Sequence, residues 1–92
     1  MKHHIIVKWN DRSTNKKLDE IRAIFDQTLE IPGVRSVEYK ENCIDRPNRY
    51  DLMIVIDMEP EALPAYDDSE PHHRWKQTFG PLMEKKAIFD CE

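Results

Sequence analysis

Two apolar runs decide the fold of this chain: HHIIVKW at residues 3–9 and YDLMIVIDM at residues 50–58. In both runs apolar residues follow one another instead of alternating with polar ones, which is typical of a strand that is covered on two faces. Because neighbouring residues of a strand point to opposite sides of a sheet, each run predicts a strand with two apolar faces.

A helix is predicted after the first strand, from residue 13 or 14 to about residue 30. Its apolar residues recur at spacings of three and four, as on a helix with one buried side: Leu18, Ile21, Phe25 and Leu29. The Ile-Pro-Gly at residues 31–33 ends this helix, because proline cannot continue it and glycine permits the reversal. A second strand over residues 34–43 and a loop over residues 45–49 follow.

The second half of the chain repeats the pattern of strand, helix and strand. After the apolar run at 50–58, a short helix is predicted from Pro60 to Tyr66, with a break at Pro64, and another helix begins at Pro71. Residues 87–89 predict a short final strand. The order β-α-β-β-α-β indicates one α+β domain over residues 1–92, with a ferredoxin-like fold and a four-stranded antiparallel sheet.

This fold predicts a homodimer. Its helices form one layer and cover only one face of the sheet, so the second apolar face of both runs would remain in water. Pairing two sheets face to face would bury it and give a dimeric α+β barrel. If His3 faces the helices, then alternation along the strand assigns His4, Ile6 and Lys8 to the dimer interface.

Several short motifs resemble those of the stress-responsive A/B barrel (Dabb) family, in the family's order. The resemblance covers nearly the whole chain and rests on KHHIIVKW at 2–9, EIPGV at 30–34, YDL at 50–52, LxxY at 63–66, PxH at 71–73 and IFD at 88–90. It implies the same dimeric α+β barrel that the two-faced strands require.

The resemblance also implies candidate catalytic residues. A plant branch of the family contains polyketide cyclases, which use a pocket between sheet and helices with a histidine on the first strand, a tyrosine, and a histidine from an HPxH segment. The positions of this chain that correspond are His3, Tyr66 and His73. Glu70 stands where the first histidine of HPxH would be, and the interval from Tyr66 to Pro71 is one residue longer than usual. His72 is expected to be a solvated residue at a helix start.

These residues suit acid–base chemistry without a metal or a cofactor. An imidazole with a pKa of about 6.5 beside a tyrosine hydroxyl can take a proton from a carbon acid or polarise a carbonyl. If the space between sheet and helices is hollow, its walls would bind a small apolar or aromatic ligand; if it is filled, the same side chains are core. The predicted ligand-binding residues are Ile5, Val7, Trp9, Phe25, Trp75 and Phe79.

Composition argues against other classes of function. The net charge is −4 and both signs are interspersed, so no basic surface for nucleic acid is expected. No apolar stretch is long enough for a membrane span, and a cytoplasmic, reducing location is the expectation. With Gly33 and Gly80 as the only glycines, no phosphate-binding loop is possible. A metal set of His3, His73, Glu70 and Asp90 can be imagined but has no ligand spacing, so no metal is predicted.

Three functions therefore remain open, and whether the protein is an enzyme remains open with them. The first is a ligand-binding dimeric barrel with histidine-based cyclase- or lyase-like chemistry. The second is a non-catalytic stress protein with a filled core, whose role is stable assembly. The third, an oxygenase that works without a cofactor, rests on fold analogy alone.

Overall fold

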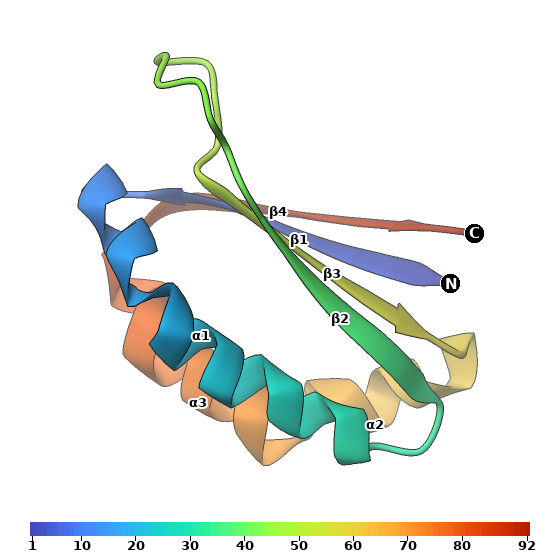
Figure 1. The fold of residues 1–92 in the computed structure, drawn as a ribbon. Coiled ribbons are helices and arrows are strands. Elements are labelled where there is room, and N and C mark those ends of the chain that lie inside the picture. The colour runs from blue at the N-terminus through green and yellow to red at the C-terminus, as the bar shows by residue number, and fades with distance from the viewer.

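The computed structural model describes all of residues 1–92 and contains one four-stranded antiparallel sheet (Figure 1). The strands are β1 (Lys2–Trp9), β2 (Val34–Glu41), β3 (Leu52–Met58) and β4 (Met83–Cys91), in the spatial order β2-β3-β1-β4. All the helices lie on the same face of this sheet. The predicted α+β, ferredoxin-like fold is confirmed.

The predicted first helix consists of three consecutive segments. A 3-10 turn η1 (Arg12–Lys17) leads into α1 (Leu18–Phe25), and a second 3-10 turn η2 (Asp26–Glu30) ends it. The first cap is Asp11, whose carboxylate accepts a hydrogen bond from the amide of Ser13 at 2.9 Å. The elements between β3 and β4 are η3 (Pro60–Ala62), α2 (Leu63–Asp67), α3 (Glu70–Phe79) and η4 (Gly80–Leu82).

The last strand is longer than the sequence predicts. β4 spans nine residues, whereas the apolar pattern indicated only residues 87–89. It is an edge strand that pairs with β1 alone, and an edge strand can carry charged residues because one of its sides stays in solvent. The charged residues at 84–86 therefore hide the start of this strand from an analysis of hydropathy.

The core lies between the helices and the sheet. His3, Ile5, Val7 and Trp9 of β1 all point into it and are buried, as alternation from His3 predicts. The Ile-Pro-Gly turn leads into β2 through Gly33, which has a φ of 95° and lies close to the β-carbon of Ala62. Further core side chains come from β3 and the helices: Leu52, Ile54, Ile56, Met58, Ile21, Ile24, Phe25, Ala62, Tyr66, Trp75 and Phe79.

The opposite side of the sheet has no helix over it, and we call it the open face. His4, Ile6 and Lys8 of β1 point to this side, as predicted. The register places Ile6 between Met53 and Ala87, and His4 between Val55 and Phe89. The side chain of Phe89 is 61% exposed. The open face therefore carries a row of apolar side chains, of which Phe89 is exposed, Ile6, Met53 and Ala87 are partly exposed and Val55 is buried.

None of the helices has the length and the apolar composition that a membrane span requires.

Candidate functional site

His3 forms a pair with a carboxylate across two strands. Asp90 of β4 stands directly opposite His3 of β1, and its Oδ1 lies 2.5 Å from the Nδ1 of the imidazole. The Nδ1–H donates to this carboxylate, so the lone pair of Nε2 is left free to accept a proton. The imidazole is buried, whereas the Asp90 side chain is 38% exposed. Asp90 thus fixes both the orientation of His3 and the nitrogen that can act as a base.

Tyr66 is the second member of the site. It lies in the short helix α2, and its ring meets the His3 ring edge to face, with 5.4 Å between the ring centroids. The residue is 1% exposed, and its buried hydroxyl has no hydrogen-bond partner. Burial raises the pKa of Tyr66, and the negative charge of Asp67 acts in the same direction. The phenol therefore stays protonated and is available as a hydrogen-bond donor.

His72 of α3 is the third member. Its ring lies against the ring of Tyr66, with a centroid distance of 4.8 Å, and its Nδ1–H donates to the carbonyl oxygen of Asp67 at 2.8 Å. Burial lowers the pKa of His72, and the positive charges of Lys76 and Lys86 also lower it, against the opposing effect of Asp67. His72 is therefore neutral at neutral pH.

His73, which the sequence predicted for this site, lies elsewhere. Its side chain is 51% exposed, and its Nε2 is 3.8 Å from the carboxylate of Asp68. The structure brings His3, Tyr66 and His72 together and leaves His73 at the surface of α3. Sequence spacing contains the signal for this difference, because His72 precedes the buried residues Trp75 and Phe79 of α3 by three and seven positions.

The connection between α2 and α3 sets which side of α3 faces Tyr66. α2 ends at Asp67, and the side chain of Ser69 accepts a hydrogen bond from the amide of His72 as it caps the next helix. Successive residues of a helix are rotated by about 100°, so His72 and His73 point to different sides of α3. His72 then occupies the side of α3 that faces Tyr66.

The six predicted ligand-binding residues are buried and pack on one another. Trp75 lies at the centre, with ring centroids at 4.9 Å from Phe25, 5.4 Å from Phe79 and 6.1 Å from Trp9. The indole Nε1–H of Trp9 donates to Asn15 at 2.8 Å. None of the six lines either of the two pockets in the structure. The space between sheet and helices is filled by these side chains.

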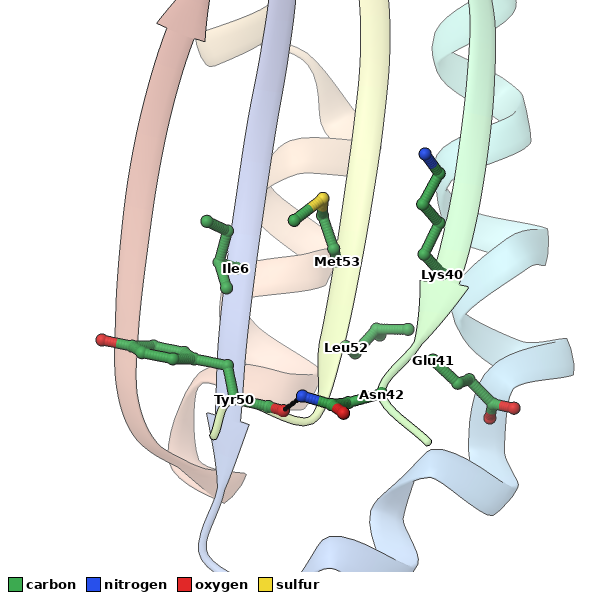
Figure 2. Close-up of a pocket in the computed structure, with 7 residues that line it drawn as sticks. All are labelled: Ile6, Lys40, Glu41, Asn42, Tyr50, Leu52 and Met53. Atoms are coloured by element: carbon green, nitrogen blue, oxygen red, sulfur yellow. Dashed lines mark hydrogen bonds between the residues drawn. The ribbon is translucent and has the colours of Figure 1, made fainter. Parts of the chain in front are cut away.

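The first pocket lies on the open face, beside the loop that joins β2 to β3 (Figure 2). It has a volume of about 160 Å³. The amide of Asn42 donates to the carbonyl oxygen of Tyr50 at 2.8 Å and closes the base of the loop. The pocket is lined by Ile6, Lys40, Glu41, Asn42, Tyr50, Leu52 and Met53. The sequence did not predict this pocket. It predicted only that the strands have a second apolar face, and Ile6 and Met53 of that face line the pocket.

The second pocket is entirely polar and belongs to the support of the same loop. Arg12 donates to the carbonyl oxygen of Asn42 at 2.7 Å, and its Nε lies 3.6 Å from the carboxylate of Asp51. Asp51 is buried, and it accepts a hydrogen bond from the amide of Trp9 at 2.9 Å. These groups bind one another, so they stabilise the junction of β1, η1 and β3.

Neither a metal centre nor a disulfide is present among residues 1–92. No group of three or more His, Cys, Asp or Glu side chains is placed to hold a metal ion. Cys43 is exposed, Cys91 is half-buried, and both are free.

Solved structures share this fold at low sequence identity. A dimeric ferredoxin-like protein of unknown function from Jannaschia sp. CCS1 has a TM-score of 0.78 at 19% identity, covering 99% of this chain and 96% of that one. A Dabb family protein from Mesorhizobium loti has a TM-score of 0.74 at 16% identity, with 99% and 93% covered. The hydroxynitrile lyase from Passiflora edulis has a TM-score of 0.72 at 16% identity, with 96% and 87% covered.

At these identities the structures show a common fold and nothing more specific. No curated protein matches the sequence. The family described as the stress responsive A/B barrel domain matches residues 1–92, the whole of this chain. The chain therefore belongs to the stress-responsive A/B barrel (Dabb) family.

Proposed function

We propose that two copies of this protein pair through their open faces, and that each binds a small apolar or aromatic ligand beside His3, Tyr66 and His72. The carrying observation is the buried hydroxyl of Tyr66, which has no partner although two imidazole rings lie beside its own ring. An unsatisfied buried hydroxyl costs about 1–3 kcal/mol, and a ligand oxygen that accepts its hydrogen would remove this cost.

The open face supports the dimer. Its apolar residues are contiguous in register across β1, β3 and β4, and a second copy offers the identical surface, as a two-fold symmetric interface requires. His4, Ile6 and Lys8 would lie in this interface. Structural neighbours described as dimeric, such as the protein from Jannaschia, are consistent with this arrangement.

The His3 cluster has the groups for proton transfer next to a carbonyl. The free Nε2 of His3 can accept a proton from a carbon adjacent to the carbonyl, while the Tyr66 hydroxyl donates a hydrogen bond to the carbonyl oxygen that gains negative charge. The imidazolium of His3 is stabilised by Asp90 and later returns its proton to the product. The reaction class is isomerisation, aldol-type ring closure or elimination, without net oxidation.

Access to Tyr66 requires His72 to move. The ring of His72 is half-buried over Tyr66, and its side chain makes one hydrogen bond, to Asp67. Rotation of this side chain would break that bond and uncover the Tyr66 ring from the side of β4. The ligand would then enter at the edge of the cluster, since the aromatic core below is filled.

A ligand screen on matched histidine variants tests the site. Thermal shifts are measured with aromatic and polyketide-like acids for the wild type, His3→Ala, His72→Ala and His73→Ala. We expect the shift to be lost in the first two variants and kept in His73→Ala, which changes an exposed residue of the same helix. Binding that survives both His3→Ala and His72→Ala would refute the site, and loss in His73→Ala alone would restore the original sequence prediction.

The filled core favours a second candidate, a non-catalytic protein whose role is stable assembly. Trp9, Phe25, Trp75 and Phe79 leave no room for a ligand between sheet and helices. This candidate predicts a dimer that shows no thermal shift with any compound of the screen. In that case Tyr66→Phe should change stability only.

A further inference from the structure

The side of β4 that faces the helices is not covered by them. Register pairs Lys86, Ile88 and Asp90 with Val7, Ile5 and His3, so both sets point to the same side of the sheet. The three residues of β1 are buried, whereas Ile88 is 48% exposed and Lys86 and Asp90 are exposed. The helix layer therefore ends beside β1 and leaves these three residues as a strip of surface, which we call the β4 shelf.

The β4 shelf is continuous with the His3 cluster. At one end Asp90 binds His3, and at the other end the positive charge of Lys86 adds to burial and to Lys76 in lowering the pKa of His72. Three kinds of group follow one another along the strand: a carboxylate held by a histidine, an apolar side chain, and an ammonium group. Residues 86 and 90 are about 13 Å apart along an extended strand, which is the length of a small amphipathic molecule.

The two charged residues of the β4 shelf differ in their contacts. Asp90 is paired with His3, so Lys86 is the shelf charge without a partner. Lys76 of α3 also acts on His72 as a positive charge, while Asp67 is the nearby negative group. Together with the exposed apolar surface of Ile88, the ammonium group of Lys86 suits a molecule that is apolar in the middle and anionic at one end.

We propose that the β4 shelf binds a small aryl or alkyl carboxylate, with its apolar body on Ile88 and its carboxylate at Lys86. This inference rests on the proposed function and specifies its ligand class. Lys86 is then a specificity-determining residue: it selects the anion, whereas His3 and Tyr66 act on the opposite end of the same molecule. The neighbouring residue Lys85 points to the open face, where its Nζ lies 5.2 Å from the Tyr50 ring centroid.

Lys85 supplies a matched control, because it is the neighbouring lysine of the same strand and points to the other face of the sheet. The full chain is titrated with phenylacetate, 3-phenylpropionate and 4-phenylbutyrate and with their neutral primary amides, and binding is followed by amide NMR shifts. The proteins are the wild type, Lys86→Gln and Lys85→Gln. We expect the largest shifts at residues 86–90.

The carboxylates should bind the wild type about two- to five-fold more tightly than the amides, as for a partly exposed ion pair. In Lys86→Gln, and in the wild type at 0.5 M salt, this ratio should approach one; Lys85→Gln should retain it. An unchanged ratio in Lys86→Gln, or an equal loss in Lys85→Gln, would overturn the carboxylate assignment alone. If neither acids nor amides shift any resonance near His3, the proposed function fails together with it.

Discussion

Replacing Tyr66 by phenylalanine should stabilise the ligand-free protein while weakening its ligand site. The substitution removes one oxygen atom and leaves the ring against His3 and His72. Because the hydroxyl is buried without a partner, its removal abolishes a desolvation cost and breaks no hydrogen bond. The same change deletes the donor that a bound carbonyl oxygen would use.

The size of the effect follows from the burial of this one group. An unsatisfied buried hydroxyl costs about 1–3 kcal/mol, so Tyr66→Phe should raise the free energy of unfolding by about 1 kcal/mol. For a domain of this length that corresponds to an increase in Tm of about 4–8 °C. Tyr39 provides the opposite case, because its hydroxyl donates to the carboxylate of Asp26 at 2.8 Å. Tyr39→Phe should lower the free energy of unfolding by about 0.5–1.5 kcal/mol.

Urea unfolding at one fixed protein concentration measures both variants, since the stability of a dimer depends on concentration. If the two urea midpoints shift in opposite directions and the dependence on urea is unchanged, the Tyr66 hydroxyl has no hydrogen-bond partner in solution. If Tyr66→Phe is destabilised as much as Tyr39→Phe, the Tyr66 hydroxyl has a partner in solution. A ligand oxygen would then find no unsatisfied donor at Tyr66, which would refute the proposed site.

Three further results are expected. Burial holds the pKa of His72 below its usual 6.5, so below that pH the unfolded chain takes up a proton more readily than the native protein. The free energy of unfolding, measured in urea, should therefore fall as the pH falls from 6.5 to 5. In His72→Gln it should change less over this pH range. Asp51→Ala should cost about 2–3 kcal/mol in the same assay, because it leaves the amide of Trp9 and the side chain of Arg12 without their buried partner. Phe89→Lys should raise the dimer dissociation constant about 100-fold in sedimentation experiments, since two copies of a large apolar side chain leave the interface.

Each of these results has a control of similar chemistry. For the pH dependence the control is His73→Gln, which changes an exposed histidine of the same helix. Asp45→Ala, at a carboxylate that is 78% exposed, should lower the free energy of unfolding by less than about 0.5 kcal/mol. Leu29→Lys changes an exposed apolar residue outside the sheet and should leave the dimer intact. Equal effects in a variant and its control would contradict the corresponding prediction.

The fold could be predicted because its decisive features are local. The sequence itself contains these features: consecutive apolar residues predict the two-faced strands, and Ile-Pro-Gly predicts the end of the first helix. The length of β4 could not be predicted in this way, because its pairing with β1 overrides a charged sequence. The apolar pattern also left open which residues of β3 face the helices, and the register settles it as Leu52, Ile54 and Ile56.

The candidate site was predicted only in part. His3 and Tyr66 do lie together, as the motifs implied, but Asp90 joins them through a pairing of residues 87 positions apart. No sequence pattern indicates such a register. Which of His72 and His73 lies beside Tyr66 depends on the rotation of α3, and the helical spacing to Trp75 indicates that side of the helix.

The mass of the particle in solution tests the central claim, that the open face of one copy pairs with the open face of a second copy. Light scattering of the wild type at about 10 μM should give twice the chain mass of 11.0 kDa. Phe89→Lys under the same conditions should shift toward 11.0 kDa, whereas Leu29→Lys should not. A wild-type particle of 11.0 kDa would contradict the account, because the apolar residues of the open face would then be exposed to water.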